Sequence, residues 1–171
     1  KYMIDAAVFW LNLGVDGFRL DYAIGPVQEF WAAFRKQTRR ANPECWTFGE
    51  VVDPPDVQRS FEGLLDGCLD FLMLEGIRQT FAFENWPASR LASFLDRHEA
   101  FFQSNFTRPS FLDNHDMNRF LWSAGNDKHL LRMAAGLLPL TVLAMPAIGL
   151  AAWLLLTPPD KSKQTGEHGE E

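Results

Sequence analysis

The chain opens with apolar and polar residues spaced as in an amphipathic helix. From Ile4 to Leu11 the apolar residues follow the i, i+3, i+4, i+7 pattern, which predicts a helix over residues 1–13. Gly14 follows the last apolar turn, where a glycine commonly ends a helix. Because no capping residue precedes the pattern, we expect the helix to begin upstream, in a longer parent protein.

Farther along, short apolar runs alternate with segments of helical period. The predicted strands cover Gly14–Asp21, Cys45–Val52, Asp66–Met73 and Arg108–Leu112, and the predicted helices among them cover Val27–Ala41 and Ser89–Phe102. A strand followed by a helix, repeated, is typical of parallel βα units. The pattern therefore predicts an α/β fold.

Toward its end the chain becomes strongly apolar and then strongly polar. Met133–Leu156 contains 24 residues without a charge, long enough for a membrane span. Prolines and glycines interrupt this stretch, so we favour a buried helix ending near Leu138 and a buried strand over Thr141–Met145. A membrane helix is the less favoured alternative. Pro158–Glu171 has no large apolar residue and is expected to be disordered.

Composition and charge narrow the class of protein. With 22 acidic and 16 basic residues among 171, the net charge of −6 argues against a nucleic-acid binder. The two cysteines, Cys45 and Cys68, could form one bridge, but two buried thiols are the favoured interpretation. No signal peptide opens the chain, which favours a cytoplasmic location.

Acidic residues stand at the ends of three predicted strands. Asp21 closes the first, Glu50 lies near the end of the second, and Asp116 comes just past the fourth. In a barrel of parallel strands, active sites gather at these ends. Arg19 shares a face with Asp21 by strand alternation, whereas Glu50 has apolar neighbours in the sequence. Two carboxylates in different surroundings are what glycoside hydrolysis needs.

Each of these residues also has a structural interpretation. An aspartate at a strand end is more often a turn or cap residue, Arg19 could serve only as an ion-pair partner, and His115 could be an ordinary loop histidine. Asp16 and Asp70 lie within their runs and are interpreted as structural. The sequence has no transition-metal spacing, phosphate-binding glycine loop or Gly-x-Ser-x-Gly turn. Composition and spacing do not decide between a catalytic and a structural role for these residues.

Three short motifs resemble those of the alpha-amylase family of glycoside hydrolases. They are Gly17–Asp21 (GFRLD), Phe48–Val51 (FGEV) and Phe111–Asp116 (FLDNHD), and they occur in the family's order with helices between them. The resemblance implies a partial (β/α)8 TIM barrel that covers about strands 4 to 8. It spans roughly residues 1–148. We therefore expect a partial catalytic barrel over residues 1–157 and a disordered tail over 158–171.

The resemblance also implies roles for individual residues. Asp21 would be the nucleophile with Arg19 as its partner, and Glu50 the general acid/base. Asp116 and His115 would grip the sugar at the cleavage point. Two aromatic residues, Tyr22 and Trp46, are candidate stacking surfaces for sugar, although we expect Trp46 to pack in the core.

The implied function is a retaining glycoside hydrolase acting on α-glucosidic bonds of starch-like or maltooligosaccharide substrates. The alternatives are an α-glucan transglycosylase and a non-catalytic, amylase-like binding or interaction remnant. The expected partner is an α-glucan or oligosaccharide substrate, with no nucleic acid or membrane. The family's first motif, which supplies part of a calcium site, is missing, and Ile24-Gly25 replaces a Lys-His pair of many calcium-dependent members. No cofactor is therefore assigned to this chain, and calcium is left open for the complete parent protein.

Overall fold

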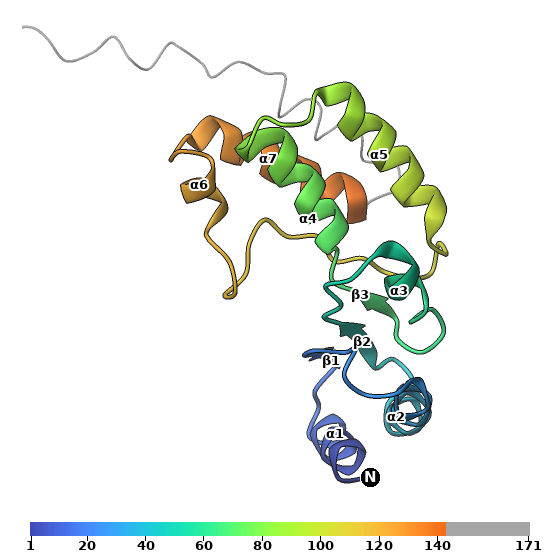
Figure 1. The fold of residues 1–171 in the computed structure, drawn as a ribbon. Helices are drawn as coiled ribbons and strands as arrows, with labels where there is room; N and C mark the ends of the chain where they lie inside the picture. Colours follow the sequence, from blue (N-terminus) through green and yellow to red (C-terminus); the bar gives the residue numbers. More distant parts are fainter. Residues whose placement is uncertain (143–171) are drawn as a thin grey trace, which may run out of the picture.

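The computed structural model describes residues 1–142, and Figure 1 shows how their elements are arranged. Helices and strands alternate through the first half, and helices dominate the second. In chain order the elements are α1 (Tyr2–Asn12), β1 (Gly17–Leu20), α2 (Gln28–Ala41), β2 (Trp46–Gly49), α3 (Pro55–Arg59), β3 (Gly67–Cys68), α4 (Phe71–Ile77), the π-helical turn η1 (Arg78–Ala82), α5 (Ala88–Phe101), α6 (Phe120–Ser123) and α7 (Lys128–Val142).

The strands form a parallel sheet in the order β1-β2-β3, as the βα pattern predicted. The register pairs Leu20 with Gly49 at the end of β1 and β2. One residue later the Glu50 N–H still donates to the Leu20 carbonyl at 2.8 Å. Asp21 and Glu50 therefore leave the sheet together, at the carboxyl ends of neighbouring strands.

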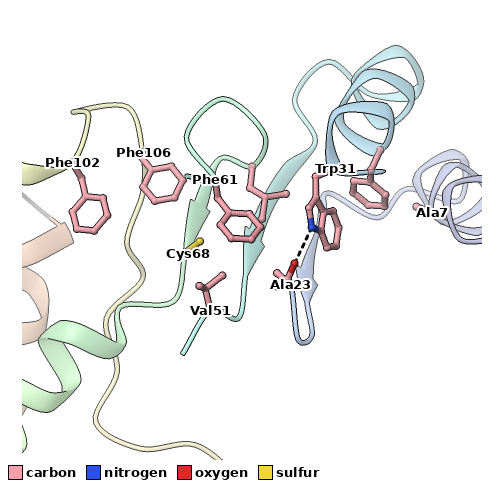
Figure 2. Packing of buried hydrophobic residues seen from close by; sticks show 10 residues of the cluster. Ala7, Ala23, Trp31, Val51, Phe61, Cys68, Phe102 and Phe106 are labelled. Atoms are coloured by element: carbon pink, nitrogen blue, oxygen red, sulfur yellow. Dashed lines mark hydrogen bonds between the residues drawn. The ribbon is translucent and has the colours of Figure 1, made fainter. Parts of the chain in front are cut away.

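One face of the sheet packs against helices. Phe18 meets Phe34 of α2 edge-on with 6.1 Å between ring centroids. Figure 2 shows the buried residues that continue this cluster toward β3 and the segment after α5, including Val51, Cys68 and Phe106. Both cysteines are free and buried, as the favoured interpretation predicted.

The other face carries Arg19 with Trp46 and Phe48, because these positions alternate with the helix-facing ones. Trp46 stacks obliquely on Phe48, with 4.7 Å between centroids, yet remains 38% exposed. The expectation that Trp46 packs in the core was therefore wrong. Among the described residues, this face has no second layer that would cover the indole ring.

The predicted third strand, Asp66–Met73, is much shorter than expected. Only Gly67 and Cys68 pair with β2, and α4 begins at Phe71. Asp70 accounts for the change, because its side chain accepts a hydrogen bond from the Met73 N–H at 2.9 Å and caps the helix.

The predicted fourth strand, Arg108–Leu112, is irregular in the structure. Only Thr107, one residue earlier, forms an isolated parallel bridge, to Gly67. The backbones approach so closely there that a Cβ at Gly67 would lie 2.0 Å from the Thr107 carbonyl oxygen. Pro109 has no N–H to donate to the ladder, although its carbonyl still accepts the Asp70 N–H at 3.0 Å.

Helices α4, α6 and α7 enclose a second cluster, built on Met73, Ile77, Phe120 and Ala134. Helix α7 runs to Val142, so the predicted strand at Thr141–Met145 was wrong over its first two residues. Its remainder, the end of the apolar stretch and the tail over 158–171 lie outside the described residues. Within residues 1–142, no helix has the length and apolar character to cross a membrane.

Candidate active site

Arg19 joins the two carboxylates at the ends of β1 and β2. Its Nη1 contacts Asp21 Oδ1, and its Nη2 lies 2.9 Å from Glu50 Oε1. The Asp21 side chain is 76% exposed, whereas that of Glu50 is only 13% exposed. The sequence suggested apolar surroundings for Glu50, but the parallel register brings a guanidinium to it from the neighbouring strand. The Arg19 guanidinium therefore contacts both the exposed Asp21 carboxylate and the largely buried Glu50 carboxylate.

Backbone groups fix Glu50 further. The Tyr22 N–H donates to Glu50 Oε2 at 3.2 Å, and the Ala23 N–H donates to the Glu50 carbonyl at 3.0 Å. The Ala23 carbonyl in turn accepts a 2.9 Å hydrogen bond from Trp31 Nε1, drawn in Figure 2. This chain of contacts ties the turn after β1 both to Glu50 and to the buried face of α2.

Tyr22 adopts a backbone conformation that is unusual for its residue type. Its φ is +44°, in the left-handed region where non-glycine residues are uncommon and strained. The same turn directs its N–H at Glu50 and leaves its side chain exposed. At Gly25, an added Cβ would lie 2.8 Å from the Tyr22 ring, so a larger residue there would clash with the ring in this position. Strain of this kind is concentrated at functional sites.

Asp116 lies in the loop between the irregular segment 108–112 and α6. His115 Nε2 lies 3.3 Å from Asp116 Oδ2, and both side chains are exposed, 73% and 62% respectively. The Asp116 N–H donates to Asn114 Oδ1 at 3.0 Å. Within the described chain the Asp116 carboxylate contacts His115 and forms no ion pair with Arg19. The structure thus brings Asp21 and Glu50 each into contact with Arg19 and leaves Asp116 as a separate group.

A pocket of about 540 Å³ lies next to the segments that follow Glu50 and Asp116, although none of the five residues of the two groups lines it. Val52–Pro54, just after Glu50, line one side of it, and Met117, next to Asp116, lines another. Arg78 and residues of α4 complete the walls. The segments that follow Glu50 and Asp116 therefore border one hollow, large enough for part of a small-molecule ligand.

Asp113 anchors the start of the loop that carries Asp116. Its Oδ1 lies 2.6 Å from Arg119 Nη1, and its Oδ2 accepts the Phe120 N–H at 2.8 Å. Partial burial raises the pKa of Asp113, but the Phe120 N–H and the positive charges of Arg119 and Arg78 outweigh it, so the pKa falls below its ordinary value. The carboxylate remains ionised and caps α6.

Sequence reasoning missed two residues around this loop. Asp113 lies inside the third motif without an assigned role, and Arg78 lies in a run that carries no motif. Asp113 lies seven residues before α6, so its contact with the Phe120 N–H could not be read from the sequence as an N-cap. Nothing in the spacing around Arg78 indicates its contacts. Among residues 1–142, no group of three or more His, Cys, Asp or Glu is placed to hold a metal ion.

Comparisons with known proteins agree on one family. The family model for the alpha amylase catalytic domain matches residues 1–150. Alpha-amylase 2 of Dictyoglomus thermophilum is 39% identical over 148 residues, which cover 86% of this chain and 26% of that protein. Neopullulanase 2 of Thermoactinomyces vulgaris is 31% identical over 151 residues, covering 86% and 25%. The chain therefore spans about a quarter of the length of these relatives.

A solved structure shows the same relationship. An Anoxybacillus alpha-amylase superposes with a TM-score of 0.71 at 26% identity, over 80% of this chain and 32% of that one. The family match covers far more than half of the chain and includes all three motifs. This chain belongs to the alpha-amylase family of glycoside hydrolases.

Proposed function

We propose that this chain forms part of a (β/α)8 barrel, from about strand 4 to strand 8, and carries the catalytic residues of a retaining α-glucan hydrolase. The parallel sheet and the likeness to alpha-amylase structures support the barrel. The relatives' names, alpha-amylase and neopullulanase, support an α-glucan or maltooligosaccharide substrate.

The shared guanidinium carries the proposal for the reaction. Arg19 contacts both Asp21 and Glu50 at neighbouring strand ends, which supports a single site that contains a nucleophile and an acid/base. Exposed Asp21 attacks the anomeric carbon, while Glu50 protonates the departing oxygen and later activates water. Retention requires the two carboxyl groups to lie about 5–5.5 Å apart.

Asp116 and His115 act on the sugar rather than on the bond that breaks. Asp116 accepts hydrogen bonds from sugar hydroxyls and favours the distorted ring, with His115 as its charged or polar partner. The 540 Å³ pocket bordered by Met117 and Val52–Pro54 supports a ligand bound next to the segments that follow Asp116 and Glu50. The exposed Tyr22 ring offers a stacking surface for a sugar.

We expect the 171-residue chain by itself to have little or no glycosidase activity. Tyr2, Met3, Phe9, Trp10 and Leu13 are all exposed on or just after α1. A largely apolar pocket of about 460 Å³ also lies open between α1, β1 and α2. Catalytic groups must be held to about 0.5 Å, which an uncovered sheet edge does not ensure.

The test supplies the remaining barrel from a relative. In the completed chimera, the matching part of this chain replaces the corresponding 148-residue segment of Dictyoglomus thermophilum alpha-amylase 2. Reducing-sugar release from soluble starch and maltooligosaccharides is measured for the chain and the chimera, with Glu50→Gln as the blank. We expect turnover by the chimera but not by the isolated chain. In the Glu50→Gln chimera the turnover should be about 10²- to 10⁴-fold lower. The first-formed product should be the α-anomer in proton NMR spectra.

Two results would contradict the proposal. Unchanged turnover in the Glu50→Gln chimera would remove Glu50 from the chemistry, and a β-anomer as first product would exclude retention. Robust turnover by the isolated chain, abolished by Glu50→Gln, would keep the site but show that the remaining strands are not needed.

A further inference from the structure

Arg78 extends its guanidinium into the base of the loop that carries Asp116. Its Nη1 donates to the carbonyl of Asn118 at 3.2 Å and, more weakly, to that of Leu112 at 3.4 Å. Its Nη2 donates to Ser123 Oγ at 2.7 Å. Leu112 precedes the Asp113–Asp116 stretch and Asn118 follows it. One side chain therefore holds both ends of the loop and also contacts α6.

The setting of Arg78 shows that its place is specific. It is only 9% exposed, and it begins the π-helical turn η1, a distortion frequent at functional sites. The guanidinium carbon lies 5.7 Å from the centroid of the Phe83 ring, and Nη1 lies 3.8 Å from Met117 Sδ. A buried cation is costly unless its donors are satisfied. Here the loop's carbonyls satisfy them.

The chemistry of the contacts requires an arginine. Two backbone carbonyls and a hydroxyl are met from different directions by one planar group. A lysine ammonium is a compact point charge and lacks this fixed fork of donors. The positive charge of Arg78 also acts on Asp113, the residue that caps α6 from within the same loop. Arg78 and Asp113 therefore stabilise the same loop conformation from two sides.

We propose that Arg78 is a positioning residue that fixes the loop over residues 112–118 and thereby places Asp116 against the sugar. The effect on the reaction rests on the proposed role of Asp116, whereas the effect on the loop does not. No strand pairing holds Asp116, since the described segment before it is irregular. A small displacement of such a group costs about 100-fold in rate.

The first test measures the loop in the full 171-residue chain. Hydrogen exchange followed by mass spectrometry compares Arg78→Lys and Arg78→Met with the unchanged chain over peptides covering 112–120 and β1–β2. Arg39→Lys is the matched control, because Arg39 is also a partly buried arginine that contacts a backbone carbonyl and a carboxylate, Asp66. We expect exchange over 112–120 to accelerate about tenfold in Arg78→Lys, more in Arg78→Met, and not in the control.

Two results of this test would overturn the proposal. One is unchanged exchange over 112–120 in Arg78→Lys. The other is an equal acceleration over β1–β2, which would mean general loss of stability. If Arg78→Met fails to fold, Arg78→Lys and Ser123→Ala, which removes the hydroxyl that accepts from Arg78 and donates to the Arg119 carbonyl, still decide the question.

The second test links the loop to the sugar through a double-mutant cycle in the completed chimera. We expect Arg78→Lys to lower kcat/KM about 10- to 100-fold and to add nothing further when Asp116 is already alanine. Additive losses would overturn the positioning role. An Asp116→Ala chimera with full activity would instead refute the proposed function of Asp116, and the exchange result would still stand.

Discussion

The structure holds its acidic residues in two different ways. Asp21 and Glu50 stand at the ends of paired strands, where backbone hydrogen bonds fix their order and spacing. Asp116 stands in a loop whose shape depends on two side chains, Arg78 and Asp113. Activity that depends on Asp21 and Glu50, the sheet group, should therefore tolerate most side-chain changes nearby but be lost when Arg19 is replaced. Activity that depends on Asp116, the loop group, should be lost on substitution of distant residues that do not contact the sugar.

The largest expected effect is loss of Arg19, the residue that the sheet group shares. Arg19→Met in the completed chimera should lower kcat about 10²- to 10³-fold, since it removes a preorganised charge beside both carboxylates. Steady-state kinetics on maltooligosaccharides measures the change. Arg40→Met, an exposed arginine at the far end of α2, is the control and should leave kcat within twofold. Similar losses of kcat in both variants would show that Arg19 has no specific role in the reaction.

The second effect concerns the opposite end of the sheet, at Asp66. Its carboxylate lies 2.7 Å from Arg35 Nη1 and 2.6 Å from Arg39 Nη2, and it also accepts the Thr47 N–H at 2.9 Å. Asp66→Asn removes the charge that both arginines face and should lower the free energy of unfolding by about 2 kcal/mol. Urea unfolding of the full chain measures it.

The control for this variant is Asp96→Asn on the exposed side of α5, with an expected change below about 0.5 kcal/mol. A loss at Asp66 no larger than at Asp96 would mean that the cluster is screened by solvent.

The third effect is acid sensitivity of the loop. Burial raises the pKa of Asp113, but the Phe120 N–H, Arg119 and Arg78 lower it further, to a net value below the ordinary one. A lowered folded-state pKa means that the stabilisation is present above the unfolded pKa, about 3.9, and is lost as the pH falls through the folded value. Exchange protection over 113–120, relative to α2, should therefore fall from about pH 4 downward.

Asp113→Asn supplies the comparison for that experiment. Its loop should already be weakly protected at pH 6 and change little on acidification, because the titrating group is gone. Protection that falls equally in Asp113→Asn and in the unchanged chain would assign the acid effect to other groups.

The sequence predicted the sheet far better than the loop, for physical reasons. Strand alternation is local, so Gly17–Asp21 and Phe48–Val51 could be assigned to strands from their apolar runs, and the succession of strand and helix indicated a parallel sheet. The third-strand prediction was wrong beyond Cys68 because the Asp70 carboxylate caps a helix that begins at Phe71. Arg78 could not be found, since its partners lie more than 30 residues away and are mostly backbone carbonyls.

The smallest effect is the reactivity of the two thiols. Burial raises the pKa of Cys68 to about 12 and also raises that of Cys45. At pH 8 about one Cys68 in ten thousand is then a thiolate, the form that reacts. We expect iodoacetamide to leave both thiols unmodified in the folded chain and to label both in urea, as read by intact mass. Rapid labelling without urea would show that the cluster around β3 opens readily.

The central claim is that Asp21 is the nucleophile and Glu50 its acid/base partner. In the Glu50→Gln chimera, α-maltosyl fluoride can still glycosylate the nucleophile, because fluoride leaves without a proton, while hydrolysis of the resulting ester lacks its base. Peptide mass spectrometry after rapid acid quench should then find a maltosyl group on the peptide containing Asp21, and none in the Asp21→Asn, Glu50→Gln double variant. A maltosyl group on Asp116, or on neither residue despite fluoride release, would contradict the account.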